Sequence, residues 1–556
     1  MSGLFILLLS LVMLGAAYLF YGRWIARNWG IDPQAKTPAY ELADGVDYVP
    51  APKHVVFGHQ FASIAGAGPI NGPIIAAMFG WVPVLLWILL GGIFFGAVQD
   101  FAALYASIKN KGRTIGYIIE LYIGKTGKKL FLLFVWLFSI LVVAAFSDIV
   151  AGTFNGFQAD GTLNPANAST ATTSGLFIVA AVIFGFYLHF RKPSKAMTAL
   201  TGTALMAGSI ILGLIFPVYL PQNTWLYFVF AYVFIASVTP IWVLLQPRDF
   251  LNSFLLVFMI IAAVVGVFVA NPQIKLPAFT GFNVNGQMLF PMMFVTVACG
   301  AVSGFHSLVA SGTTSKQIQN EKDILPVSFG TMMLECSLAV IALIAVGSLA
   351  TGGKLPAETP PVIFAKAIAG FLAILGFPQG TSFSILTLAI SAFALTSLDS
   401  VARVGRLAFQ EFFLDSKTDD KNISPLLKLM TNKLFATGVT LFLSYVLSVV
   451  GYQNIWPLFG SANQLLSVLA LFALAVFLKK TNRKGFMLWA PMAIMLAVTF
   501  TALFQIIFNI FHKMSTTGSF IFYSDGLQIV FGSLLLTLGF LVTASCIKKL
   551  WESTKP

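Results

Sequence analysis

An apolar segment from about residue 57 to residue 80 contains the sequence GHQFASIAGAGPINGP, residues 58–73. Hydropathy alone would make this segment one membrane-spanning helix, but glycines and two prolines fall inside it. Glycine weakens a helix and proline lacks the N–H group that would continue it, so we predict a break near Gly66–Pro69, with Pro69 as the first residue of a restarted half-helix. Non-helical backbone at membrane depth is tolerated where it is buried in protein or lines a cavity. The free N–H groups of the half-helix would face that cavity, as in transporter substrate sites; the alternative is a proline kink without a ligand.

The composition is that of a membrane protein with many spans. Of the 556 residues, 58% are hydrophobic and 10% are charged, and the mean hydropathy is +0.88. Runs of about 20 apolar residues recur from end to end, which no soluble domain shows. The three cysteines fall in apolar segments, which indicates packing and neither disulfides nor a metal cluster. The N-terminal residues Met1-Ser2-Gly3 lack the basic region of a cleavable signal peptide, so we expect the first span to be retained.

The apolar runs and the loop charges together predict an all-α polytopic membrane protein with about 15–18 transmembrane helices. Segment 361–376 is apolar but short, so we expect a re-entrant or extracellular helix there. Residues 115–123 form a short amphipathic stretch that should lie along the membrane surface. The fifteen expected spans are 4–22, 57–80, 83–108, 129–151, 174–190, 196–216, 224–245, 250–270, 288–310, 327–350, 382–403, 432–450, 456–478, 486–511 and 526–547.

Positive charge predicts the orientation of these spans. With the N-terminus outside, 29 of the 33 Lys and Arg residues, Arg248 among them, fall in inner loops. Cytoplasmic loops carry the excess of Lys and Arg, and a missing span would scramble this alternation. We therefore expect a cytoplasmic-membrane protein with its N-terminus outside and its C-terminus inside, and we do not read the net charge of +13 as a sign of nucleic-acid binding. The outer loops hold Lys275, Lys354, Lys366 and Lys513.

A second interrupted helix is predicted in segment 288–310, which contains ACGAVSGFHSL at residues 298–308. It lies seven spans after the first, so the two run in opposite directions across the membrane. Paired interrupted helices of opposite direction indicate an inverted repeat with the site at its interface. The alternative is that the small residues only allow close helix packing. With five spans in each repeat, the chain divides into a first repeat (57–216), inserted helices (217–287), a second repeat (288–480) and C-terminal helices (481–556).

Ionisable side chains at membrane depth are the candidates for coupling. Such charges are costly and functional by default. Asp100 and Glu335 lie deep in their predicted spans, so we predict that they carry protons, with structural hydrogen bonds as the alternative. His59 and His306 flank the two breaks, and histidine titrates near neutral pH. We group His59 with the two carboxylates as a coupling residue, and we assign His306 to the substrate.

We expect the substrate carboxylate to bind backbone N–H groups at the two breaks. One histidine at each break, without a cluster of cysteines or carboxylates, predicts no metal site. There is no GxxxxGK[ST] phosphate loop and no catalytic constellation, so we expect neither ATP-driven transport, nor an enzyme, nor a cofactor. The candidate substrate-binding residues are Gly66, Ala67, Gly68, Pro69, Asn71, Ser303, Gly304, Phe305 and His306.

Segment 382–403 carries further polar residues near its inner end. Thr396, Ser397 and Ser400 could supply hydroxyls to a sodium ion near a broken helix, although such residues are common in membrane helices. The choice between proton and sodium coupling therefore stays open. Asp399 precedes Arg403 by one helical turn, which predicts an ion pair within the segment.

Over most of its length the sequence resembles the carbon starvation protein A family. The first family motif usually has two consecutive histidines, whereas here Gln60 follows His59. The stretches that carry the resemblance are DGVDYVP (44–50), GHQFASIAGAGPINGP (58–73), GAVQDF (96–101), GAVSGFHSLVASGTTSKQ (300–317), LDSVAR (398–403) and WPLFGSANQLL (456–466).

This resemblance implies a transporter of the cytoplasmic membrane that scavenges carbon sources during starvation. The family is associated with peptide uptake, and some members with proton-coupled pyruvate import. The resemblance also implies the inverted five-plus-five core of the amino acid–polyamine–cation transporters, which is LeuT-like. The stretch that starts at Trp456 would be the last core helix. Gln99, Asn463 and Gln464 are candidates for lining the permeation path, with helix packing as the alternative.

We therefore expect a secondary active importer of small peptides, with a proton-coupled symporter of pyruvate or another small carboxylate as the alternative. A peptide predicts a larger cavity and an acceptor for the amino group, for which Asp100 is a candidate. Pyruvate predicts a small, neutral-to-basic site. A nutrient-binding membrane sensor is the alternative from another class, but the tail after Ile547 is short for an output domain. A channel is disfavoured by helices broken in inverted pairs.

Overall fold

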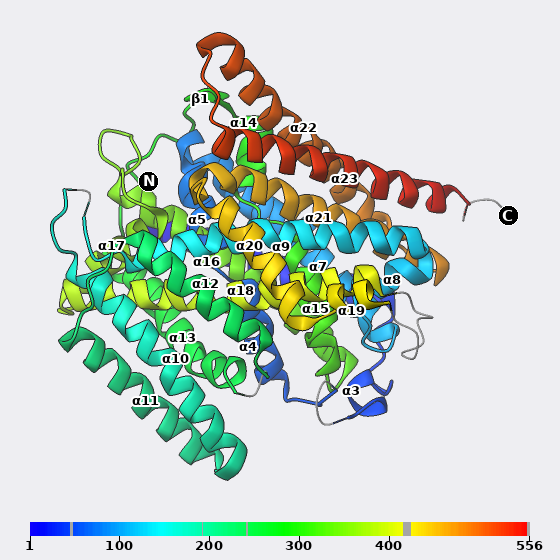
Figure 1. Cartoon of the computed structure of the whole chain (residues 1–556), viewed down its shortest axis with the longest axis horizontal. Helices are drawn as coiled ribbons and strands as arrows, with labels where there is room; N and C mark the ends of the chain where they lie inside the picture. Colours follow the sequence, from blue (N-terminus) through cyan, green and yellow to red (C-terminus); the bar gives the residue numbers. More distant parts are fainter. Residues whose placement is uncertain (45–47, 159, 192, 241–242, 415–423, 553–556) are drawn as a thin grey trace.

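The computed structural model describes residues 1–44, 48–158, 160–191, 193–240, 243–414 and 424–552, and these residues fold mainly into helices (Figure 1). Residues 45–47 of the resemblance stretch 44–50 lie outside the described residues. A two-stranded antiparallel hairpin, β1 (Asn283–Val284) with β2 (Gln287–Met288), precedes the second predicted break. The α-helices are α1 (Gly3–Ala16), α2 (Arg23–Trp29), α3 (Pro38–Glu41), α4 (Lys53–Ile64), α5 (Gly68–Ala76), α6 (Trp81–Leu86), α7 (Ala97–Lys109), α8 (Ile115–Tyr122), α9 (Lys125–Phe154), α10 (Pro165–Arg191), α11 (Lys195–Ile215), α12 (Gln222–Val238), α13 (Leu245–Ala270), α14 (Leu289–Thr296), α15 (Gly304–Gly312), α16 (Thr331–Leu349), α17 (Pro360–Ala373), α18 (Gln379–Phe413), α19 (Pro425–Met430), α20 (Lys433–Ser448), α21 (Tyr452–Lys480), α22 (Phe486–Thr517) and α23 (Leu527–Glu552).

Each of the fifteen predicted spans coincides with one helix or with consecutive helical segments. Within the described ranges, eleven helices are long and apolar enough to cross a membrane, or twelve if the bent pair Lys53–Ile64 and Gly68–Phe79 is counted as one span. Helices α12 and α20 are shorter, with 17 and 16 residues, and the segment 288–310 is divided between α14 and α15. An all-α polytopic membrane fold is confirmed.

The two short elements predicted outside the regular spans are also helices. Helix α8 occupies the amphipathic stretch, and its apolar face, Ile115, Ile118 and Ile119, is fully buried. Its first turn is capped by Thr114, whose Oγ1 accepts a hydrogen bond from the Tyr117 N–H at 3.4 Å. Helix α17 occupies segment 361–376, begins at two prolines and has 14 residues. Fourteen residues rise about 21 Å, which is short of the hydrocarbon thickness of a bilayer.

The first break lies where the glycines and prolines predict it. Helix α4 ends at Ile64 and α5 begins at Gly68, one residue before Pro69, with a bend of 45° between them. Proline is tolerated in the first turn because the N–H groups there have no partner within the helix. A Cβ on Gly68 would lie 2.5 Å from Cys299 Sγ, so this position requires glycine for the two breaks to touch.

The second break separates α14 from α15 by residues 297–303. Here α21 lies directly against the start of α15. A Cβ on Gly304 would lie 2.4 Å from the backbone nitrogen of Ser467 on α21, a distance that real Cβ atoms essentially never show. The small residues of this segment therefore allow both an interruption and a close packing of helices, which the sequence presented as alternatives.

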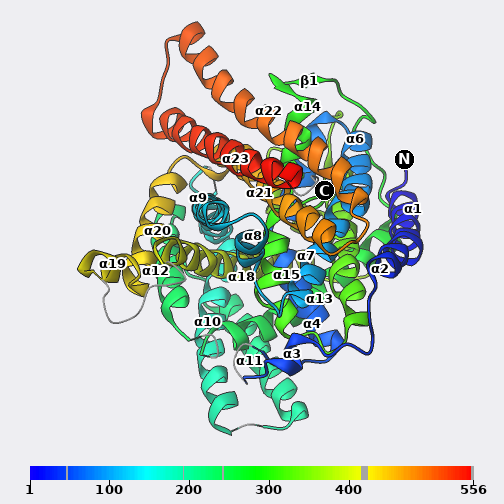
Figure 2. The same ribbon diagram turned by 90° about the vertical axis from the view of Figure 1, so that its right-hand side faces the viewer.

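The remaining helices surround these breaks. Helices α9 and α18 pack along each other in the middle of the molecule, and α21, whose apolar stretch is buried throughout, packs on α9 and α15. The α10–α11 hairpin lies at one end of the molecule and α22 and α23 lie at the opposite end (Figures 1 and 2). The two breaks are therefore enclosed by helices that come from distant parts of the chain.

Candidate functional site

Three ionisable side chains meet at the start of α15. The Nδ1 atom of His306 is 3.0 Å from Asp100 Oδ2, and its Nε2 atom is 3.3 Å from Glu335 Oε2. All three side chains are fully buried, and they come from α15, α7 and α16. A buried charge is costly without a partner. Each of the three groups supplies such a partner to its neighbour, so the triad as a whole can bind a proton. Two of the predicted coupling residues lie in this triad, and its third member is the histidine that the sequence assigned to the substrate.

His59 lies apart from this triad. It is half-buried on α4, and its Nε2 atom is 3.2 Å from Thr313 Oγ1. The next residue, Gln60, is fully buried, and its Oε1 accepts a hydrogen bond from Thr314 Oγ1 at 2.5 Å. Both side chains therefore contact the segment that follows α15. Gln60, which stands where the family usually has its second histidine, acts here as a hydrogen-bond acceptor.

Gln99 holds the start of α15 against α7. Its Nε2 donates to the backbone oxygen of Ser303 at 2.7 Å and to Ser307 Oγ at 2.8 Å, and its Oε1 accepts a hydrogen bond from Ser467 Oγ. An amide with three partners is fixed in one orientation. The neighbouring Asp100 is thereby positioned toward α15. Gln99 was predicted to line the path, and in this structure it contacts the protein on all sides.

Asn463 and Gln464 on α21 serve the two ends of the second break. Asn463 Oδ1 accepts hydrogen bonds from the Phe305 N–H at 3.2 Å and from Ser303 Oγ at 3.1 Å. The first N–H groups of a helix have no partner within that helix, and α15 receives one here from another element. Gln464 Nε2 donates to the backbone oxygen of Phe294 at 2.6 Å, near the end of α14. Asn463 also lines the cavity between the breaks, and Gln464 does not.

A cavity of about 20 Å³ lies between the two breaks, with room for about one water molecule. Its lining is mostly apolar and contains no charged side chain. Three of the predicted substrate residues, Gly66, Gly68 and Phe305, lie in this lining. The full set is Ile64, Gly66, Gly68, Phe138, Val142, Phe146, Cys299, Phe305, Ser397, Val401, Phe459 and Asn463.

The other predicted substrate residues lie behind this lining. Ala67 and Pro69 are buried in the first break, and Ser303 and Gly304 are buried at the start of α15 against α21. Asn71, one helical turn after the first break, is fully buried, and within the described ranges neither of its amide atoms has a hydrogen-bond partner. Such a group is costly to bury.

The three hydroxyl residues predicted for sodium on α18 have different surroundings. Thr396 Oγ1 accepts a hydrogen bond from Asn252 Nδ2 at 3.0 Å and donates to the backbone oxygen of Ala392 at 2.9 Å. Ser397 lines the cavity, and Ser400 is half-buried. Across the described part of the chain, no group of three or more His, Cys, Asp or Glu side chains could hold a metal ion.

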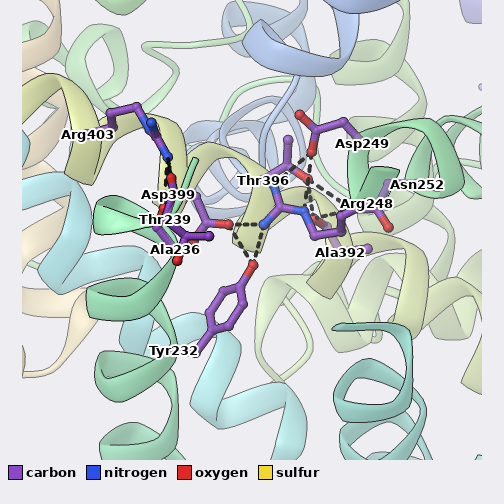
Figure 3. A network of polar contacts seen from close by, with 10 residues as sticks. All are labelled: Tyr232, Ala236, Thr239, Arg248, Asp249, Asn252, Ala392, Thr396, Asp399 and Arg403. Carbon is purple, nitrogen blue, oxygen red and sulfur yellow. Dashed lines mark hydrogen bonds and ion pairs between the residues drawn. The ribbon is translucent and has the colours of Figure 1, made fainter. Parts of the chain in front are cut away.

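The predicted ion pair between Asp399 and Arg403 is wrong. Asp399 instead pairs with Arg248 of α13, while Arg403 donates to the backbone oxygens of Ala236 at 2.8 Å and Thr239 at 3.0 Å (Figure 3). The last carbonyl groups of a helix have no partner within that helix, so the end of α12 offers acceptors to the guanidinium of Arg403. The placement of Arg248 in an inner loop is also wrong, since it is 2% exposed within a helix. The sequence signal for this was the position of Arg248, two residues before the start of the long apolar run 250–270.

Comparisons with known proteins show the family and the fold of this chain. The family described as "Carbon starvation protein CstA" matches residues 2–370 and 354–502. The peptide transporter CstA of Bacillus subtilis is 31% identical, over 99% of this chain and 97% of its own. The pyruvate/proton symporter BtsT of Escherichia coli is 30% identical, over 87% and 78%. A solved variant of the Eremococcus coleocola manganese transporter has the same fold, with a TM-score of 0.50 and 11% identity over 92% of this chain and 99% of that one. The chain therefore belongs to the carbon starvation protein CstA family of membrane transporters.

Proposed function

We propose that this chain imports small peptides across the cytoplasmic membrane, driven by protons that the triad His306–Asp100–Glu335 carries. The triad is the observation that carries this proposal. It is fully buried, and its histidine directly follows Phe305, which lines the cavity between the breaks. A change of charge on His306 therefore acts on the first turn of α15, beside the position where a substrate would bind.

The charges of the triad supply the coupling. With an imidazolium between two carboxylates the group carries one net negative charge, and one further proton makes it neutral. A net charge at membrane depth is costly. The protonated triad is therefore favoured while it is buried, and the deprotonated triad is favoured when α7, α15 and α16 separate and admit water. A proton that is bound on one side and released on the other thus biases the direction of the conformational change.

The substrate would bind where the two breaks meet. Its carboxylate would be held by backbone N–H groups at the start of α5, since no cationic side chain lines the cavity. The amino group of a peptide would be held by backbone carbonyls freed at the breaks, because Asp100 is already engaged by His306. The second candidate is pyruvate or another small carboxylate. The observation that favours it is a small cavity without an acidic residue for an amino group.

We also propose that α12 and α13, rather than α10 and α11, complete the first repeat. Helix α13 packs on α18 and α17, as α21 packs on α9 and α8. Helix α12 likewise packs on α9 and α20. Elements that follow the same order in two inverted repeats should make matching contacts. This proposal moves the insertion from residues 217–287 to the peripheral α10–α11 hairpin.

Uptake by proteoliposomes tests the function. Labelled dipeptide and labelled pyruvate are supplied with and without an inward proton gradient. We expect the parent protein to accumulate the dipeptide only with the gradient. In His306→Gln we expect gradient-driven accumulation to fall at least about tenfold, because one of three proton sites and the central partner of both carboxylates are lost. His512→Gln is the matched control, because His512 is exposed on α22, and it should behave like the parent.

Two results would contradict the proposal. If the substrate accumulates equally with and without the proton gradient, uptake is not coupled to protons. If His306→Gln keeps full gradient-driven accumulation, the triad does not carry the coupling proton. Exchange of labelled for unlabelled substrate without a gradient separates coupling from binding, and we expect His306→Gln to retain exchange. Accumulation of pyruvate alone would select the second candidate substrate.

A further inference from the structure

A second buried charge cluster lies where α12, α13 and α18 meet (Figure 3). The Arg248 guanidinium contacts the carboxylate of Asp399 and the hydroxyl of Tyr232, and its Nη2 is 2.7 Å from Asp249 Oδ1. The side chain of Asp399 is fully buried and that of Arg248 is 2% exposed. Breaking such a pair leaves a buried charge without compensation, which is strongly unfavourable. Asp399 therefore needs a neighbouring cation, or a proton of its own, while it is buried.

Helix α18 carries this cluster on one face and borders the first break with another, where Ser397 lines the cavity. Thr396, one helical turn before Asp399, lies on the same face as Asp399, and its Oγ1 accepts a hydrogen bond from Asn252 Nδ2 at 3.0 Å. Within the described ranges, Asp399 Oδ1 and Asn252 Oδ1 have no hydrogen-bond partner. A carboxylate, a hydroxyl and an amide oxygen are donors that suit hard cations.

The positive charge at this position belongs to the protein. Arg403, one helical turn after Asp399, is turned to the end of α12 and bonds backbone oxygens there. Arg248 reaches Asp399 from α13 and is held by Tyr232 and Asp249 as well. A guanidinium stays charged at any physiological pH and cannot leave the site. A metal ion at the same position would have to bind and dissociate in each transport cycle.

We propose that Arg248 is a tethered cation that holds the place of an alkali-metal ion beside Asp399, so that uptake by this chain needs no sodium. Removal of the guanidinium opens an alkali-cation site formed by Asp399 with the hydroxyl of Thr396 and the amide oxygen of Asn252. The inference rests on the proposed transport function for its uptake measurement, and a second measurement on the purified protein is independent of transport.

Two measurements compare sodium chloride with choline chloride at equal ionic strength. Proton-driven uptake by the parent protein should be the same in both salts. Arg248→Ala should lose uptake in choline and regain at least about fivefold in sodium, because the metal ion supplies the missing charge. The thermal midpoint of purified Arg248→Ala should be about 2–4 °C higher in sodium than in choline, and that of the parent should not change. In the double variant Arg248→Ala/Asp399→Asn the carboxylate is also absent, so both sodium effects should vanish.

Sodium-dependent uptake by the parent protein would overturn the proposal whatever the variants do. So would an Arg248→Ala protein whose uptake and thermal midpoint are the same in both salts. If Arg248→Ala cannot be purified from choline, its yield of folded protein in sodium is the readout, and an equal failure in both salts counts against the proposal. If the parent transports neither substrate, the proposed function fails, and the thermal comparison still decides about Arg248.

Discussion

The two histidines beside the breaks have similar sequence surroundings and different partners. His306 touches two buried carboxylates, whereas His59 touches the hydroxyl of Thr313. His59 lies just before a stretch of small residues and His306 follows one, so the local sequence does not distinguish their roles. What distinguishes His306 is that Asp100 and Glu335 reach it from other helices. The proposed role of His306 in carrying a proton therefore depends on packing between helices.

Gly304 offers a test of the close contact between α15 and α21. In Gly304→Ala the new Cβ would meet backbone atoms of Ser467 and Asn463 at 2.4–2.6 Å, and backbone cannot turn aside as a flexible side chain can. We expect a loss of about 1–3 kcal/mol or more in the free energy of unfolding, seen as a lower thermal midpoint in detergent, and a loss of uptake.

Gly208→Ala is the matched control, since Gly208 also lies in a helix, α11, but has open space around its Cβ position. Alanine is the better helix former, so this change should be neutral or stabilise by up to about 1 kcal/mol. Equal thermal midpoints for the two variants would show that the two helices are not in contact at Gly304.

Helix α21 is the element that makes an interrupted α14–α15 segment stable. Its Trp456 Nε1 donates to the backbone oxygen of Thr296 at 3.2 Å, and Gln464 bonds a second oxygen near the end of α14. Its Asn463 accepts from the first turn of α15. Backbone groups that leave a helix inside the membrane need such partners, because lipid offers none. The motif WPLFGSANQLL therefore stabilises the break, in addition to its predicted place along the permeation path.

Replacement of Asn463 tests this role. In Asn463→Ala the Phe305 N–H and the Ser303 hydroxyl lose their acceptor. We expect a loss of about 1–2 kcal/mol in the free energy of unfolding and a lower thermal midpoint, as for the loss of a helix cap. Asn454→Ala is the control on the same helix, because Asn454 is exposed and its amide donates to the backbone oxygen of Val450 in the turn just before α21. If the two variants unfold at the same temperature, Asn463 does not stabilise the break.

At the scale of the whole molecule, the proposed orientation places the N-terminus outside and the C-terminus inside. The excess of Lys and Arg in alternate loops supports it. The helices coincide with all fifteen predicted spans, and the charge count assumes that each of them crosses the membrane once. A shift by one span would exchange the two faces and place most of the positive charge outside.

Labelling of single introduced cysteines tests this orientation directly. Lys354 and Lys484 are both exposed, and they lie in loops that the expected orientation puts on opposite sides of the membrane. Each is replaced in a separate variant, Lys354→Cys or Lys484→Cys. With a membrane-impermeant maleimide added to intact cells, we expect the cysteine at 354 to be labelled several-fold above the parent protein, and the one at 484 only after the membrane is opened. The reverse pattern would show that the orientation is inverted. Labelling of both cysteines in intact cells would contradict an odd number of membrane crossings between residues 354 and 484.

The sequence alone determined the class of fold, the fifteen helical segments and the position of both breaks, because these depend on local composition. Apolar runs set the helices, and the glycines and prolines of residues 66–73 interrupt the first span wherever the rest of the chain lies. The family followed from motifs in the same way. Asp100 and Glu335 could be chosen as candidates because a carboxylate at membrane depth is unusual by itself.

Only the tertiary structure decided which of these residues act together. His306 meets Asp100 across 206 residues of sequence, and Asp399 meets Arg248 across 151, and no local pattern predicts either pair. Arg403, one turn from Asp399 along the same helix, was the expected partner and is turned away. The physical reason is that a buried charge selects its partner by the distance between atoms, and this distance is set by which helices pack side by side.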